Sequence, residues 1–166
     1  RRVCGLGPLT PEFPLWRTLT IGGVSKDELL RKLGDGFYIS DWAKGIMAQP
    51  GFTTLPQLTE IQLVKARVKD LGFTEPPTTT ELLARIREVG DLCPAEVGPH
   101  LLLNLTDQSR NDWFAVAMEL AAVSVGVPCV FLLYRDVDGR QWLDSHCVRP
   151  DDQWHLEDEI VFLLRK

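Results

Sequence analysis

The chain has 166 residues, of which 45% are hydrophobic and 25% are charged, and its formal net charge is -5. This composition is that of a folded globular protein with one core, and the length is short for two domains of ordinary size. The acidic balance and the lack of a basic run argue against nucleic acid as a partner, because phosphate backbones are bound by clustered Lys and Arg. No apolar run reaches the ~20 residues needed to cross a bilayer, so we expect no membrane partner either.

The N-terminal segment is set apart from the rest of the chain. Residues 1–20 contain three prolines and lack the apolar core of a signal peptide. We interpret them as a tail or a processed N-terminus, and we expect a single α+β domain over residues 21–166.

The four cysteines, Cys4, Cys93, Cys129 and Cys147, show no Cys-x-x-Cys spacing. A chain of this size with an adequate core does not need disulfides for stability. We therefore interpret the cysteines as reduced thiols and the protein as cytoplasmic.

Two short helices are predicted near the start of the domain, followed by a strand. Ser25 and Glu28 match a capping box ahead of a helix that ends before Gly34. Ser40 begins a second helix, which Pro50 limits. Residues 58–71 partly alternate apolar and polar side chains, which predicts a strand.

A third helix has the clearest signals in the sequence. Thr78 and Glu81 match a second capping box, and apolar residues follow at helical spacing until Gly90. The next segment, residues 92–100, contains two prolines and a glycine in close succession, and we expect an ordered, non-helical connection there.

The sequence pattern in the second half of the chain predicts an antiparallel β-meander. We expect strands at residues 101–106, 113–122, 127–135 and 140–148, with turns at Ser124-Val125-Gly126 and at Asp138-Gly139. A final strand over residues 159–164 is too apolar to lie at an edge. The predicted fold class is α+β, with an antiparallel β-sheet made of the meander and the C-terminal strand, and with two or three helices packed on one side.

The run Leu-Cys-Pro-Ala-Glu-Val-Gly-Pro at residues 92–99, with its flanking motifs, resembles a family of small uncharacterised bacterial proteins. The resemblance covers roughly residues 37–166 and implies no activity. The chain departs from the family pattern at residues 120–126, where a polar Pro-Ile-Thr-Asp-Ser-Asp-Gly hairpin is replaced by Leu-Ala-Ala-Val-Ser-Val-Gly. Leu102 also stands where the pattern often has Arg. These exchanges of polar for apolar residues suggest a natural scaffold with an engineered surface.

A hairpin tip is normally polar, so the apolar tip predicts a protein interface. We expect a non-enzymatic association domain that binds a protein partner or itself as a homo-oligomer. The interface residues are three exposed anchors and the residues that flank them: Val123, Val125 and Val127 with Leu120, Ala122 and Cys129. The alternative to an interface is that the N-terminal segment, with Phe13 and Trp16, packs over the apolar tip within the same chain.

Catalytic and metal sites receive little support from the sequence. His146 and Cys147 are neighbours in a predicted strand, so their side chains point to opposite faces. Cys93 and His100 could approach one another across the proline-containing connection, but a buried structural cysteine is the commoner case. His146, His155 and Asp144 show no metal-ligand spacing. We therefore expect no metal and no cofactor.

Two other functions stay open. A carboxylate-dependent hydrolase or nuclease would use acids such as Glu96, Asp107 and Asp144. A small-molecule-binding domain would line a deep cavity with tryptophans, namely Trp113, Trp142 and Trp154.

Overall fold

The computed structural model describes residues 13–122 and 128–165. Nine strands in these residues form one curved sheet, whose continuous order is β1-β3-β9-β5-β7-β8-β2. The strands on this path are β1 (Arg17–Ile21), β2 (Tyr38–Ile39), β3 (Thr59–Arg67), β5 (Trp113–Val116), β7 (Pro128–Arg135), β8 (Gln141–Cys147) and β9 (Glu159–Leu164). Two further strands of two residues each extend the sheet: β4 (Gly90–Asp91) pairs with β9, and β6 (Ala121–Ala122) pairs with β7.

The predicted α+β class is confirmed, but the expectation of a purely antiparallel sheet is wrong. Strand β9 pairs with β3 antiparallel on one side and with β5 parallel on the other. The short strand β2 also runs parallel to β8. The C-terminal strand returns to the middle of the sheet, between strands that are distant in sequence, and this position sets the parallel pairing.

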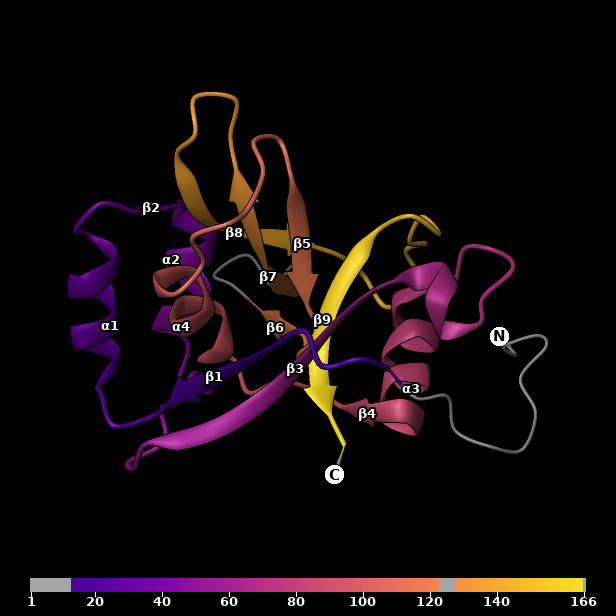
Figure 1. Ribbon diagram of the computed structural model, residues 1–166, viewed down its shortest axis with the longest axis horizontal. Helices are drawn as coiled ribbons and strands as arrows, with labels where there is room; N and C mark the ends of the chain where they lie inside the picture. The colour runs from indigo at the N-terminus through magenta and orange to yellow at the C-terminus, as the bar shows by residue number, and fades with distance from the viewer. Residues whose placement is uncertain (1–12, 123–127, 166) are drawn as a thin grey trace.

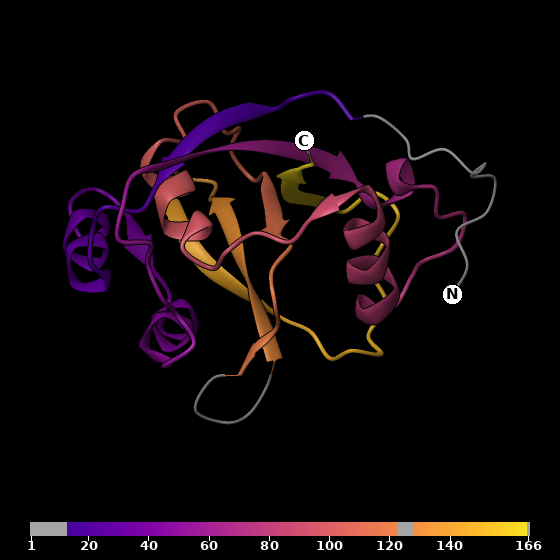
Figure 2. The same ribbon diagram turned by 90° about the horizontal axis from the view of Figure 1, so that it is seen from below.

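The described residues also form four α-helices, namely α1 (Lys26–Leu33), α2 (Asp41–Ala48), α3 (Thr79–Val89) and α4 (Val97–Leu103), and a 3-10 helix, η1 (Val68–Leu71), follows β3. Helices α1, α2 and α4 lie at one end of the molecule and α3 lies at the other (Figures 1 and 2). The sequence analysis expected two or three helices, one or two fewer than the described residues contain. No helix within the described ranges is long and apolar enough to cross a membrane.

The helix starts follow the local signals. The Ser25 hydroxyl accepts a hydrogen bond from the Glu28 amide, and the Ser40 hydroxyl accepts one from Ala43. Both bonds of the capping box between Thr78 and Glu81 are present, at 3.2 and 3.0 Å. At Ser25 the return bond of the box is replaced, because the Glu28 carboxylate binds Arg31.

The predicted strand at residues 101–106 is wrong, because residues 101–103 belong to α4 and residues 104–106 lie in neither a helix nor a strand. The connection at residues 92–100 was also expected to be non-helical, yet the helix begins at Val97. Pro99 lies in the first turn, where its missing N–H is not needed by the helix. A Cβ at Gly98 would lie 2.7 Å from the Phe131 ring, so glycine lets α4 pack directly on β7.

The N-terminal end of the sheet begins inside the segment that the sequence analysis set apart. Strand β1 starts at Arg17 and pairs antiparallel with β3 along its whole length. Its residues Leu19 and Ile21 are buried in the core. At the centre of the sheet, Ile160, Val161 and Phe162 of β9 are also buried. The prediction that the C-terminal strand lies inside the sheet is confirmed.

Strand β7 carries a hairpin at each end. The hairpin to β8 turns through Val137 and Asp138, and Gly139 has the positive φ of 87° that the turn requires. At the other end, β7 pairs with β6 at Ala122 and Pro128. The predicted strand at residues 113–122 is thus interrupted between β5 and β6, and the predicted Ser124-Val125-Gly126 turn lies outside the described residues.

The interpretation of the cysteines as reduced thiols is wrong for two of them. Cys129 in β7 and Cys147 in β8 are directly opposite one another and form a disulfide. Cys93 has a free thiol and is buried. Disulfides persist in oxidising surroundings, so this bond does not support the expected cytoplasmic location.

Candidate functional site

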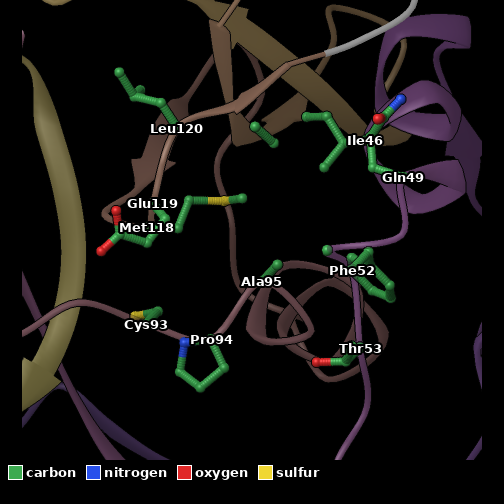
Figure 3. A pocket seen from close by; sticks show the side chains of 12 residues that line it. Ile46, Gln49, Phe52, Thr53, Cys93, Pro94, Ala95, Met118, Glu119 and Leu120 are labelled. Carbon is green, nitrogen blue, oxygen red and sulfur yellow. The ribbon is translucent and has the colours of Figure 1, made fainter.

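A cleft of about 450 Å³ opens beside the base of the β6–β7 hairpin. Helix α2 and the segment after it form one wall, and the segments before α4 and before β6 form the other (Figure 3). The side chains of Ile46 and Met118 point toward one another across it. The cleft is lined by Ile46, Gln49, Gly51, Phe52, Thr53, Cys93, Pro94, Ala95, Met118, Glu119, Leu120 and Ala121.

The walls of this cleft are mainly apolar and carry little charge. Met118 is buried, and its sulfur accepts a hydrogen bond from the Phe131 amide. The Gln49 side chain donates to the Gly45 carbonyl. Among the described residues of the lining, Glu119 alone is charged, and its exposed carboxylate pairs with Arg87 at 3.1 Å. The cleft therefore suits an apolar group far better than an ion.

The structure brings only part of the predicted interface to this cleft. Leu120 lines it and packs against the core. Ala122 pairs through its backbone with Pro128. Cys129 is fully buried in the disulfide, so it cannot serve as a surface contact. The three anchors of the interface, Val123, Val125 and Val127, lie outside the described residues.

The N-terminal aromatics have partners of their own. The Phe13 ring lies edge-on to Phe162 at 5.5 Å, and the Trp16 ring lies edge-on to Phe114 at 5.5 Å. Both rings pack over the central strands β9 and β5, so neither lines the cleft at the hairpin base.

The suggested pair of Cys93 and His100 is not formed. The Cys93 thiol points to the Val161 carbonyl at 3.8 Å, and burial raises its pKa far above the usual range. His100 borders a different surface depression and hydrogen-bonds Glu96. A protonated, buried thiol without a base beside it is not an activated nucleophile.

Glu96 holds three distant segments together. Its carboxylate accepts hydrogen bonds from the amides of Gly22 and Leu55 and from Nε2 of His100, at 3.2, 2.7 and 3.1 Å. Burial lowers the pKa of His100, although the hydrogen bond to Glu96 and the charge of that carboxylate oppose the shift. These contacts give Glu96 a structural role that the sequence analysis missed. The only sequence signal was a carboxylate four residues before a histidine.

The other acids proposed for hydrolysis are separated from Glu96. Asp107 is exposed and pairs with Arg17, whose guanidinium lowers the pKa of that carboxyl group. Asp144 accepts a hydrogen bond from the Ser145 amide. In the part of the chain that the structure describes, no group of three or more His, Cys, Asp or Glu residues is placed to hold a metal ion.

No tryptophan lines any of the clefts that residues 13–122 and 128–165 form by themselves. Trp113 and Trp154 both pack against His146, with ring centroids 5.9 and 5.0 Å from that of the imidazole. Burial lowers the pKa of His146. Trp142 instead stacks on Tyr38. These rings act as packing groups, and none of them lines the cleft beside the hairpin.

Comparison of the chain with protein-family models, with curated proteins and with solved structures gives no match.

Proposed function

We propose that the protein is an association domain that binds a protein partner or a second copy of itself through the apolar hairpin at residues 120–129 and the cleft at its base. The observation that carries this proposal is the mainly apolar cleft of about 450 Å³ beside Leu120 and Ala121. This apolar cleft lies next to the base of a hairpin whose connecting residues include Val123, Val125 and Val127 in the sequence.

The base of the hairpin is well anchored for such a role. Its two strands pair at Ala121 with Cys129 and at Ala122 with Pro128. Cys129 is also bonded covalently to Cys147 in the neighbouring strand. An anchored base lowers the conformational entropy that binding would otherwise remove.

The size of a stable interface explains why the cleft belongs to the proposed surface. Such interfaces bury about 800 Å² on each partner and involve roughly 20–30 residues a side. The residues of a hairpin tip alone are too few, so the cleft walls supply the remaining apolar area. Each Å² of apolar surface removed from water contributes about 25 cal/mol.

Light scattering coupled to size exclusion tests self-association over roughly a hundred-fold range of protein concentration. We expect a mass above that of the 18.7 kDa chain at high concentration. The double variant Val123→Asp, Val125→Asp should convert this species to a folded monomer. A matched control is Val137→Asp, because Val137 is 63% exposed in the turn of the other hairpin. Monomeric protein at every concentration would show that self-association through this hairpin is wrong.

A further inference from the structure

A second cleft lies on the other side of α2 from the one beside the hairpin. It has a volume of about 540 Å³ and is formed by α1, β2 and α2 with the segment between α1 and β2. It is lined by Lys26, Leu30, Gly34, Phe37, Tyr38, Ile39, Lys44, Met47 and Ala48. The two clefts have no lining residue in common, so the inference below goes beyond the proposed association surface.

The floor of this second cleft is apolar. Leu30, Phe37 and Ile39 are half-buried and pack against the core, and Met47 is 1% exposed. Tyr38 is 45% exposed and stacks on Trp142, so one face of the cleft ends in an accessible aromatic ring. Such a surface fits the hydrocarbon or aromatic part of a small molecule.

The charged residues that the structure describes in this cleft are both positive. Lys26 from α1 and Lys44 from α2 line it, and none of the described acidic residues does. Within the described residues neither lysine takes part in an ion pair, whereas Arg31 of α1 pairs with Glu28 and Lys69 of η1 pairs with Glu157. Two lysines thus line one cleft of a protein whose net charge is -5.

Helix stability does not account for the position of Lys26. It is the first residue of α1, where the helix dipole favours an acidic side chain over a basic one. Its ammonium group lies 5.8 Å from the centroid of the Phe52 ring, a contact that leaves its N–H donors available. A lysine with free donors at the border of an apolar hollow fits recognition of an anionic group.

We propose that this second cleft binds a small amphiphilic anion, a molecule with an apolar body and one carboxylate or similar anionic group. The apolar body lies on Leu30, Phe37 and Met47. The anionic group lies between Lys26 and Lys44, the two charged residues of the lining among those that the structure describes. The same apolar body without its charge loses these two contacts and binds more weakly.

Two fluorescent probes that share one aromatic frame test the charge requirement. Anilinonaphthalene sulfonate is anionic, and phenylnaphthylamine has the same rings without the sulfonate. We expect the anionic probe to bind the folded protein more tightly at pH 7. The double variant Lys26→Gln, Lys44→Gln should raise the Kd of the anionic probe by roughly ten-fold, which is the scale of one or two charge contacts near a surface. The Kd of the neutral probe should stay unchanged.

Two controls assign the effect to this cleft. The double variant Lys65→Gln, Lys69→Gln removes the same net charge elsewhere and should leave the binding of both probes unchanged. Ala48→Phe narrows the second cleft and should weaken binding of both probes, whereas Ala95→Phe narrows the first cleft and should not. Binding of the anionic probe that survives the Lys26 and Lys44 changes, or that Ala95→Phe removes, would overturn the proposal.

Decanoate and decanol identify the kind of ligand. Decanoate, added as monomers, should displace the anionic probe, and decanol at equal concentration should displace less of it. Vesicles of phosphatidylglycerol present the same charge as a surface, and we expect no co-sedimentation of the protein with them. Co-sedimentation without displacement by decanoate would contradict a small-molecule site.

Discussion

A buried carboxylate and a disulfide each connect segments of this protein, and they differ in how much the folded structure depends on them. At the start of α4, the buried carboxylate of Glu96 joins three segments that are far apart in sequence. At the base of the β6–β7 hairpin, a disulfide joins Cys129 and Cys147, which belong to strands already paired along their length. The carboxylate makes long-range contacts that no local sequence signal specifies. The disulfide instead adds a covalent bond to β7 and β8, which already pair through their backbones.

The largest expected effect comes from removing the carboxylate. Glu96→Ala leaves the amides of Gly22 and Leu55 without their acceptor, and it should lower the free energy of unfolding by about 3 kcal/mol or more. Urea unfolding followed by circular dichroism measures this loss. Glu96→Gln keeps one acceptor oxygen of the same size and should cost less. Equal losses for the two variants would contradict the role given to the carboxylate.

Loss of the disulfide should have a smaller effect. The two cysteines are 18 residues apart, and closing a loop of similar length contributes about 3 kcal/mol in the chain-entropy model. Because the strands retain their hydrogen bonds, we expect the variant Cys129→Ser, Cys147→Ser to lose roughly 2 kcal/mol. Thermal unfolding with and without reductant measures it. Reductant should destabilise the natural chain but not the double variant, and a loss exceeding that of Glu96→Ala would reverse the comparison.

The N-terminal cap of α3 is a purely local interaction, and its contribution to stability can be compared with those of the Glu96 carboxylate and the disulfide. The Thr78 hydroxyl accepts a hydrogen bond from the Glu81 amide at the start of α3. Thr78→Ala should cost about 1 kcal/mol, and Thr78→Ser, which keeps the hydroxyl, should cost much less. Urea unfolding of the two variants side by side distinguishes loss of the cap from loss of the threonine methyl group.

The smallest expected change is a gradual dependence of the free energy of unfolding on pH. Burial lowers the pKa of His100 and of His146 below the usual 6.5, so the unfolded chain binds more protons than the folded one in the window just below that value. Stability is therefore complete above about pH 6.5 and falls as the pH drops through the folded pKa values. Urea unfolding across this range should show the slope, and His146→Gln should reduce it. A stability that rises as the pH falls from 7 would contradict the lowered pKa values.

Part of the candidate site could be predicted from the sequence. The apolar residues after Glu119 indicated Leu120, which does line the cleft beside the hairpin. The opposite wall, with Ile46 and Phe52, comes from a helix and a loop about seventy residues earlier, and no local pattern connects it with the hairpin. The second cleft was missed for the same reason, because Lys26 and Lys44 lie on different helices.

The sequence by itself determined the elements whose signals are local. Ser25, Ser40 and Thr78 cap their helices, Gly139 permits the β7–β8 turn, and the apolar run at residues 159–164 makes a central strand. Each of these depends on side chains and backbone groups within a few residues of one another.

Only the tertiary structure decided the remaining features. Residues 101–103 are apolar enough for a strand or a helix, and the close contact of Gly98 with Phe131 is what places α4 on the sheet. The parallel pairing of β9 with β5, the contacts of Glu96 and the disulfide all join residues that are distant in the chain or lie on separate strands. Their partners are chosen by packing and burial around one shared core, a property of the folded chain and not of any segment in it.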